Sequence, residues 1–213
     1  MRLPDSGFDA VAAFYDALAR LVYGPSLRQA QQAALEAGLP VGAGRVLVIG
    51  GGTGWVLGET LRRTPTARIL YLEASPQMLT RSRHWLQQYH PQQMAQVEFR
   101  LGTEAALLPS EQFAAILTFF FLDLFAPERL RAIVERLHTV LAPAGVWLLA
   151  DFGSPRRWWH RVLLRMMYWF FGFTTGISGR QRPPIETELR RLGLHQQLVG
   201  QFFGQMVEAS VWR

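Results

Sequence analysis

The chain has 213 residues, of which 49% are hydrophobic, and this length and composition predict one globular domain with a sizeable core. Cysteine and lysine are both absent, which excludes disulfides, thiolate metal sites, a cysteine nucleophile, Schiff-base chemistry and the lysine of a phosphate-binding P-loop. The formal net charge of +6 rests on arginine and is compatible with an ordinary solvated surface, an anionic substrate, nucleic acid or a membrane surface. No N-terminal stretch joins a basic start to a long apolar run, so we expect a cytoplasmic protein without a signal peptide.

Residues 8–37 carry apolar side chains at three-to-four spacing and predict two helices, which the Gly24-Pro25-Ser26 break separates. A pair of helices of this kind can pack on a sheet through its apolar face, or it can cover a bound ligand. The pattern alone leaves both interpretations open.

A glycine-rich turn at residues 50–54 follows the apolar run of residues 46–49 and precedes a helical pattern. This order predicts a strand, a tight turn and a helix, and a turn without Cβ atoms lets its backbone approach a ligand closely. The glycines are spaced G-x-G-x-G. The dinucleotide-binding pattern G-x-G-x-x-G needs a glycine where Trp55 or Leu57 stands, so the sequence disfavours a nicotinamide or flavin dinucleotide site.

The next apolar run, residues 67–73, predicts a second strand, and it ends in an acid, Glu73. Ser75 is placed to cap a helix over residues 77–89. Nucleotide-binding folds place a carboxylate for the ribose hydroxyls about 20 residues after the glycine turn, and Glu73 lies 19 positions after Gly54. The spacing therefore favours an adenosyl-type ligand, with charge-assisted hydrogen bonds from its ribose to Glu73.

The rest of the chain continues the alternation of strands and helices. We predict strands over 96–101, 113–121 and 146–150, and helices over 127–141 and 184–192. The run 113–121 is apolar throughout, as a central parallel strand is, and the short crossover connections imply a parallel sheet. Residues 198–203 and 206–212, which meet at Gly204-Gln205, predict a terminal β-hairpin.

The G-x-G-x-G turn resembles motif I of the class I S-adenosylmethionine-dependent methyltransferases, and the opening Phe8-Asp9-x-x-Ala12-x-x-Tyr15-Asp16 is similar to the ubiquinone/menaquinone-biosynthesis type. The resemblance implies an α/β fold with a Rossmann-like, doubly wound, seven-stranded sheet. That sheet is mostly parallel with an antiparallel C-terminal strand, and an N-terminal helical lid covers it. The implied divisions of this single domain are the lid 1–44, the cofactor-binding core 45–151, a cap or substrate insertion 152–193 and the C-terminal hairpin 194–213.

The resemblance also implies S-adenosyl-L-methionine as the cofactor and a small, apolar or aromatic methyl acceptor. In such a site the glycine turn holds the methionine end near the helix N-terminus, Glu73 binds the ribose, and the 103–104 loop contacts the adenine. That loop departs from the family pattern, because Thr103 replaces the usual aspartate and the acid follows at Glu104. The expected cofactor-binding residues are Gly50, Gly51, Gly52, Thr53, Gly54, Glu73, Ala74, Met78, Thr103, Glu104, Phe119, Phe120 and Tyr15.

Residues 155–171 predict a helix with arginines on one face and aromatic and aliphatic side chains on the other. Three roles are compatible with it: a substrate-binding cap, packing against the sheet, or peripheral contact with an anionic membrane. The arginines interrupt it too often for a transmembrane span.

Methyl transfer needs a general base only when the acceptor is a poor nucleophile. The candidates are Asp123, Asp151, Tyr15 and His160, and we expect no metal site. Nucleic acid is the weaker alternative acceptor, because the Asn-Pro-Pro-Tyr type of motif of amino-methylating DNA enzymes is absent after the fourth strand and no cysteine is present for C5-cytosine chemistry. The arginines of residues 155–171 keep an RNA acceptor open. A non-catalytic cofactor-binding module is a third hypothesis, since Val48 stands where many relatives carry an acid. The oligomeric state is left open.

Overall fold

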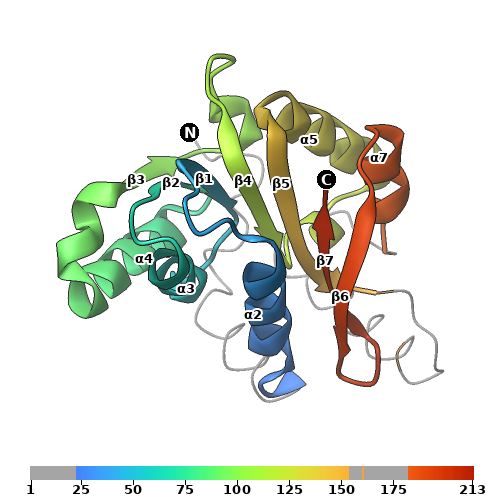
Figure 1. Ribbon diagram of the computed structural model, residues 1–213, viewed down its shortest axis with the longest axis horizontal. Coiled ribbons are helices and arrows are strands. Elements are labelled where there is room, and N and C mark those ends of the chain that lie inside the picture. The colour runs from blue at the N-terminus through green and yellow to red at the C-terminus, as the bar shows by residue number, and fades with distance from the viewer. Residues whose placement is uncertain (1–22, 154–159, 161–181) are drawn as a thin grey trace.

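The computed structural model describes residues 23–153, 160 and 182–213, and these residues form a single β-sheet with helices on both faces (Figure 1). The strands are β1 (Arg45–Ile49), β2 (Arg68–Glu73), β3 (Val97–Leu101), β4 (Phe113–Phe119), β5 (Leu141–Phe152), β6 (Gln196–Phe202) and β7 (Val207–Trp212). Their order in the sheet is β3-β2-β1-β4-β5-β7-β6. The strands β3, β2, β1, β4 and β5 are parallel, whereas β7 is antiparallel to both β5 and β6. The predicted α/β, Rossmann-like, doubly wound sheet of seven strands is confirmed.

The strand order reverses direction between β1 and β4. The two strands are parallel and Ile49 pairs with Thr118, so β1 and β4 end at the same edge of the sheet. Open α/β sheets bind ligands in the crevice at such a switch point, beyond the carboxyl ends of the strands. The glycine turn follows β1 directly, and it therefore lies at the place where the topology favours a ligand.

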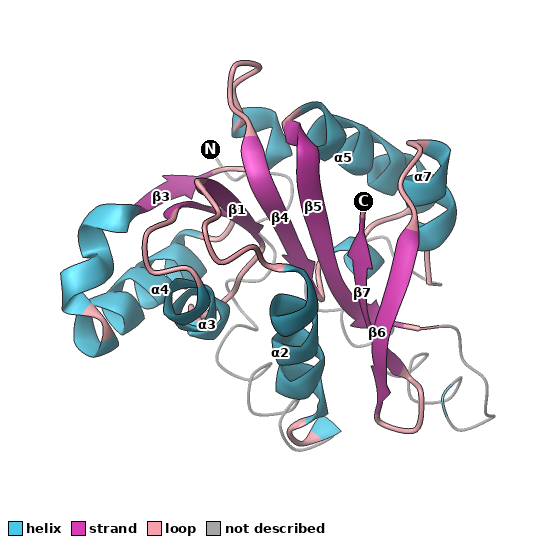
Figure 2. Cartoon of the chain, viewed as in Figure 1, coloured by secondary structure: helices cyan, strands magenta, loops and turns pink. Residues whose placement is uncertain are grey.

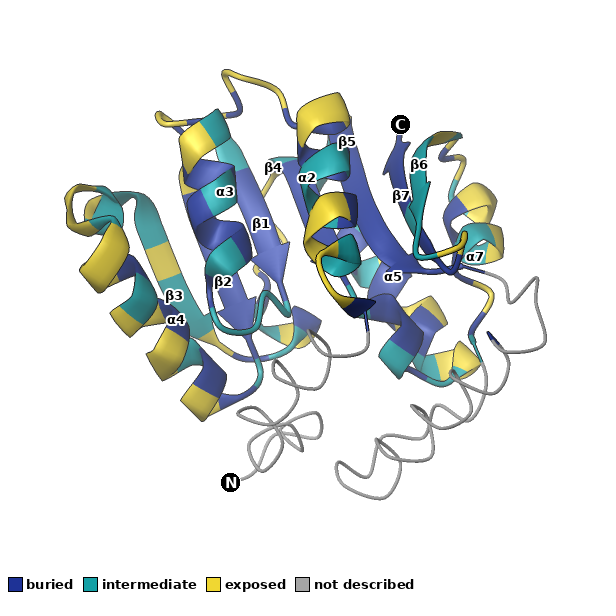
Figure 3. Ribbon diagram, turned by 90° about the horizontal axis from the view of Figure 1, so that it is seen from below, coloured by how far each residue is buried: buried dark blue, intermediate teal, exposed yellow. Residues whose placement is uncertain are grey.

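The α-helices are α2 (Ser26–Gly38), α3 (Trp55–Arg63), α4 (Pro76–Tyr89), α5 (Pro127–Thr139) and α7 (Ile185–Arg191), with short 3-10 turns η2 (Pro91–Gln96), η3 (Glu104–Ala106) and η4 (Leu122–Leu124). Figures 2 and 3 show α2, α3 and α4 on one face of the sheet and α5 and α7 on the other. The core divides accordingly, because alternate strand residues point to opposite faces: Val46 and Val48 pack with α2 and α3, whereas Leu47 and Ile49 pack with α5.

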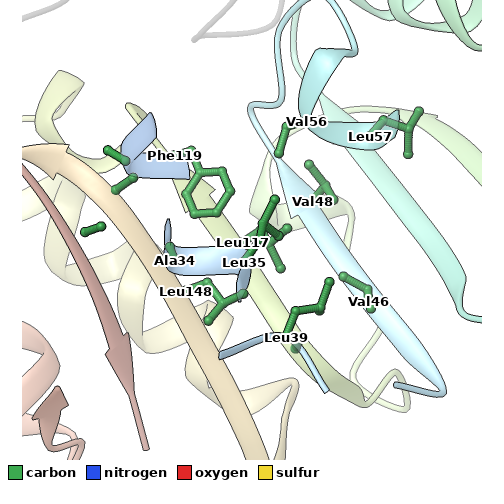
Figure 4. Packing of buried hydrophobic residues seen from close by; sticks show 14 of the residues in the cluster. Ala34, Leu35, Leu39, Val46, Val48, Val56, Leu57, Leu117, Phe119 and Leu148 are labelled. Carbon is green, nitrogen blue, oxygen red and sulfur yellow. The ribbon is translucent and has the colours of Figure 1, made fainter. Parts of the chain in front are cut away.

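Part of the expected N-terminal lid packs as a sheet-covering helix. Ala34 and Leu35 of α2 are buried, and Figure 4 shows them beside Leu117, Leu148 and Val48 in the core. The helix contacts β5, β6 and β7, while its first turns reach the glycine-turn edge of the sheet. Residues 1–22 lie outside the described residues, so a lid formed by them stays a prediction, as do the domain divisions.

The fifth strand is longer than the sequence indicated. We predicted residues 146–150 preceded by a turn, but β5 begins at Leu141, which pairs with Phe113. A shift in register then carries the chain through Pro143 to Val146, which pairs with Ala115. Asp151 accordingly does not close the strand; it lies inside it, opposite Glu208 of β7. Pairing on both sides keeps the backbone extended where local turn residues suggested a break.

None of the helices in the described ranges is long and apolar enough to cross a membrane.

Candidate functional site

The glycines of the turn are needed for different reasons. Gly50, Gly52 and Gly54 all have positive φ, at 66°, 63° and 99°, in the region where only glycine sits without strain. A Cβ on Gly50 would lie 2.4 Å from the Phe121 ring, and one on Gly54 would lie 3.0 Å from the backbone of Ser82. A Cβ on Gly52 would meet nothing within 4 Å. Gly50 and Gly54 therefore fit the turn to its neighbours, while Gly52 faces open space.

Strand β2 supports the turn with two side chains. The Tyr71 hydroxyl donates to the carbonyl of Gly52 at 2.8 Å, and a Cβ on Gly51 would lie 2.7 Å from that hydroxyl. The Glu73 carboxylate accepts from the amide of Gly52 at 3.4 Å and from the amide of Ser75 at 3.0 Å. The predicted ribose acid and the glycine turn, 21 residues apart at Gly52 and Glu73, thus lie in direct contact.

Ser75 also confirms its predicted role as the N-cap of α4. Its hydroxyl accepts from the amide of Met78 at 3.1 Å, with Pro76 in the first turn. The cap fixes where the chain turns after β2. It therefore fixes the Glu73 carboxylate, which is 8% exposed, against the turn.

A cavity of about 360 Å³ opens beside the turn, a size that suits a small ligand. Its lining residues are Gly24, Leu27, Arg28, Gln31, Gly50, Gly51, Gly52, Thr53, Trp55, Val56, Trp85, Phe119 and Phe120. Six of the predicted cofactor-binding residues are among them, from the turn and from the end of β4. Sequence reasoning missed Arg28, Gln31 and Trp85, because nothing local shows that α2 and α4 present these side chains to the turn. It also missed Trp55 as a lining residue, although Trp55 begins α3 directly after the turn.

Phe120 adopts a strained backbone conformation in the wall of this cavity. Its φ is 51°, unusual for a bulky residue. The conformation is held by a hydrogen bond from the Phe120 amide to the carbonyl of Ala150 at 2.8 Å and by the Phe152 ring, whose centroid lies 5.5 Å away. Strain of this kind gathers at functional sites.

We expect Phe120→Gly to be more stable than Phe120→Ala by about 1 kcal/mol, because both lose the ring but only glycine relieves the strain. Urea unfolding of the two variants measures the difference. The neighbouring Phe119, in β4 and without positive φ, serves as the control, and there glycine should be less stable than alanine by about 0.5–1 kcal/mol. Equal stability of the two Phe120 variants would contradict the strain.

The other predicted cofactor contacts lie outside the lining of the cavity. Ala74 and Met78 belong to the β2–α4 connection, where Met78 is buried. Thr103 caps η3. Glu104 forms a two-pronged ion pair with Arg129 of α5, at 2.5 and 2.8 Å. Sequence reasoning missed Arg129, which holds the acid that we expected to contact the adenine. That contact stays a prediction.

Two of the general-base candidates form a buried carboxyl pair, Asp123 in η4 beyond β4 and Asp151 near the end of strand β5. Asp123 and Asp151 are 1% and 3% exposed. Burial raises the pKa of Asp123 to about 6. Burial and, next, the charge of Asp123 raise the pKa of Asp151 well above its ordinary value. Oδ1 of Asp123 and Oδ2 of Asp151 have no hydrogen-bond partner among the described residues. Each acid influences the pKa of the other, so the two carboxyl groups lie close together. Two buried carboxyl groups in this arrangement can share one proton.

Phe152, Arg182 and Tyr23 interact with this carboxyl pair. Oδ1 of Asp151 accepts from the Phe152 amide at 2.8 Å. Arg182, whose charge acts on both acids, donates to the Phe152 carbonyl at 2.5 Å and pairs with Glu186. Burial and the charge of Asp123 raise the pKa of Tyr23, which precedes the first residue of the cavity wall.

The remaining candidates are less informative. His160 is fully buried, while Tyr15 and the rest of residues 155–171 lie outside the described residues. Among residues 23–153, 160 and 182–213, no group of three or more His, Asp or Glu side chains is arranged to hold a metal ion.

Comparison with known proteins agrees with this geometry. Residues 46–145 match the family model described as a methyltransferase domain. The mitomycin 7-O-methyltransferase MmcR is similar in structure, with a TM-score of 0.72 and 20% identity over 97% of this chain and 60% of that one. Human N-acetylserotonin methyltransferase, solved with its cofactor, has a TM-score of 0.66 and 18% identity over 95% of this chain and 55% of its own. The DhpI complex has a TM-score of 0.65 and 21% identity over 97% and 94%. No curated protein sequence matches.

The sheet order, the glycine turn and these matches define the class of the protein, which has the class I methyltransferase fold. Residues 46–145 match the model of a methyltransferase domain, and the fold that the resemblance to the class I S-adenosylmethionine-dependent methyltransferases implied is confirmed. The ubiquinone/menaquinone-type subgroup stays a prediction. The chain spans about 60% of the length of MmcR.

Proposed function

We propose that the protein transfers a methyl group from S-adenosyl-L-methionine to a small, apolar or aromatic acceptor. The observation that carries the proposal is the Glu73 carboxylate, held at the Gly52 amide beside a cavity at the switch point of the sheet. A carboxylate in that position suits the two hydroxyls of a ribose. The structural neighbours include the mitomycin 7-O-methyltransferase MmcR and cofactor complexes of N-acetylserotonin methyltransferase and DhpI, which supports the same class of reaction.

When bound, the cofactor supplies an electrophilic methyl group on a sulfonium, and the protein contributes binding and alignment. In this assignment the residues 50–54 bind the methionine end through backbone groups, and Glu73 binds the ribose. The Phe119 and Phe120 rings, which line the cavity, present aromatic faces that favour a cation. Ala74, Met78, Thr103 and Glu104 remain candidates for the adenine side.

We propose that the carboxyl pair of Asp123 and Asp151 accepts the proton that the hydroxyl of the methyl acceptor loses. Asp123 lies in η4, three residues after Phe120 of the cavity lining. With a pKa of about 6, Asp123 is ionised at neutral pH and accepts a proton from an acceptor hydroxyl more readily than an ordinary aspartate does. Asp151 holds the proton that the pair shares.

Calorimetric titration with S-adenosylhomocysteine tests the cofactor assignment. Binding heat and a thermal upshift are expected, and the absence of both would exclude the assignment. Turnover on a panel of phenols, quinols and small acids, with an RNA substrate beside it, then tests the acceptor class. Methylation of RNA alone would overturn the small-molecule proposal, and cofactor binding without turnover on any of them favours a non-catalytic module.

Glu73→Gln is expected to weaken binding of S-adenosylhomocysteine about 10- to 100-fold, since a charge-assisted hydrogen bond contributes roughly 1.5–3 kcal/mol. Glutamine keeps one of the two oxygens that accept from the Gly52 and Ser75 amides, so urea unfolding of the ligand-free variant is measured beside binding to show that the fold persists. Glu98→Gln changes an exposed acid of β3 outside the cavity lining and serves as the control. An unchanged dissociation constant for the Glu73 variant would remove this residue from the site.

The predicted cap or membrane-contacting role of residues 155–171 stays a prediction. Packing against the sheet is the third role left open. Flotation of the full chain with anionic liposomes at low salt tests the membrane role, because a helix that lies on a membrane through its arginines and aromatic rings would float with them. Absence of co-flotation would exclude that role.

A further inference from the structure

The cavity beside the glycine turn has one charged residue among its described lining residues, Arg28. The rest of that lining is glycine, aliphatic or aromatic, apart from the neutral polar side chains of Gln31 and Thr53. The acid that contacts the turn is Glu73 of β2, whose carboxylate accepts from the Gly52 amide and lies outside the described lining. The described lining therefore offers one charge, the Arg28 cation on its α2 side, while the carboxylate of Glu73 adjoins the turn from β2.

Arg28 is held in place by stacking on an aromatic ring. Its guanidinium carbon lies 5.1 Å from the centroid of the Trp55 ring, and Trp55 is the first residue of α3 after the glycine turn. Arginine and indole form the most favourable pairs of this kind, and a planar guanidinium that stacks keeps its N–H groups free to point sideways at a ligand.

Arg28 also differs from the arginines that support the fold. Arg63, Arg100 and Arg129 each pair with a carboxylate. Within the part of the chain that the structure describes, Arg28 is exposed and forms no ion pair with an acid. An unpaired arginine stacked at the wall of an otherwise neutral cavity is suited to an anionic ligand group, which it can bind through two parallel hydrogen bonds.

The cofactor of the proposed function carries one such group, the α-carboxylate of its methionine end. That carboxylate is repelled by Glu73, whose acid suits the ribose, and attracted by Arg28 across the turn. We propose that Arg28 binds the α-carboxylate of S-adenosylmethionine, and that Trp55 is a positioning residue which acts through Arg28. This inference rests on the proposed function, and it adds an orientation: the methionine end points to α2 and the ribose to β2.

Two ligands that differ only at the amino-acid end test the proposal. S-adenosylhomocysteine carries the α-carboxylate, whereas 5′-methylthioadenosine has the same adenosyl thioether without it. Calorimetry on the full chain should show that Arg28→Gln weakens S-adenosylhomocysteine about 10- to 100-fold and changes the affinity for 5′-methylthioadenosine less than about twofold. Arg28→Lys should restore part of the loss, since it keeps the charge without the planar fork.

Arg83 provides a matched control. Its guanidinium carbon lies 5.0 Å from the Phe99 ring centroid, on an exposed surface outside the cavity lining. Arg83→Gln removes the same kind of contact and the same charge, so both ligands should bind as they do to the unmodified chain. If Arg83→Gln lowers the affinity for S-adenosylhomocysteine as much as Arg28→Gln does, the effect comes from the net charge of the protein, and the proposal is overturned.

The positioning role of Trp55 has its own readout. Trp55→Leu should lower the preference for S-adenosylhomocysteine over 5′-methylthioadenosine, and adding it to Arg28→Gln should lower that preference little further, because the two act as a unit. Independent, additive losses would overturn the role of Trp55. If the unmodified chain binds neither ligand, the proposed function fails. If it binds S-adenosylhomocysteine and Arg28→Gln binds it equally well, or weakens both ligands alike, the assignment of Arg28 alone fails.

Discussion

Alanine in place of Gly52 is expected to weaken binding of S-adenosylhomocysteine about 100-fold while the fold persists. The Cβ would meet no atom of the described residues within 4 Å, so it occupies space beside the turn that the backbone leaves to a ligand. An added methyl group that presses against a closely packed ligand costs about 1–3 kcal/mol of binding free energy. The positive φ of 63° at residue 52 also strains alanine but not glycine. Calorimetry measures the loss of affinity, and urea unfolding should show a loss of stability of only about 1 kcal/mol.

Two other glycines separate the effect on the ligand from the effect on the fold. Gly50→Ala should destabilise the protein by about 2–4 kcal/mol, because its Cβ would lie 2.4 Å from the Phe121 ring at a positive φ. Gly44→Ala has open space and no positive φ, so it should change neither property. Normal binding by Gly52→Ala would show that the turn does not form the floor of the ligand site.

The parts of the site that the sequence predicted depend on local patterns. The G-x-G-x-G spacing and the acid at Glu73 are each read within a few residues of one strand end, and β1 and β2 are adjacent parallel strands, which brings them together. The seven-stranded fold was predictable for the same reason, because strands and helices alternate with short connections.

The parts that the sequence did not predict depend on contacts between distant segments. Arg28 reaches the cavity because α2 packs against β5, β6 and β7 and its first turns extend to the glycine turn. Glu104 pairs with Arg129, which lies 25 residues later in the chain, in α5. The full length of β5 depends on the pairing of Leu141 with Phe113. No pattern within α2, the 103–104 loop or the 141–146 segment carries this information, since tertiary pairing overrides local propensity.

The carboxyl pair leads to the second large effect, a stability that falls as the pH rises. Burial raises the pKa of Asp123 to about 6, and that of Asp151 also lies above its ordinary value. The folded protein therefore binds these protons more tightly than the unfolded chain. The resulting stabilisation is fully present below the ordinary carboxyl pKa near 4. It is lost as the pH rises through about 6 for Asp123 and through the raised value of Asp151.

Asp151→Asn should raise the free energy of unfolding at pH 8 by about 1–3 kcal/mol, the usual cost of an uncompensated buried polar group. It should also flatten the decline of that free energy with pH, because the raised pKa of Asp151 means that its ionised form destabilises the folded state. The substituted amide keeps an oxygen for the Phe152 amide and donates permanently to Asp123, in place of the shared proton. Urea unfolding across the pH range measures both effects. Glu111→Gln is the control of opposite sign: the hydrogen bond from Arg100 lowers the pKa of Glu111 to about 2, so its contribution is present at neutral pH and lost in acid.

The same variant separates a structural pair from a catalytic one. If Asp123 accepts the proton of the methyl acceptor, the permanent donor supplied by Asp151→Asn lowers the pKa of Asp123, because a hydrogen bond favours its ionised form. The acidic limb of the turnover profile should then move below pH 6, whereas Asp123→Asn should abolish that limb together with most of the turnover. A stability profile that flattens while the turnover profile stays unchanged would confine Asp123 and Asp151 to holding the end of β4 against β5.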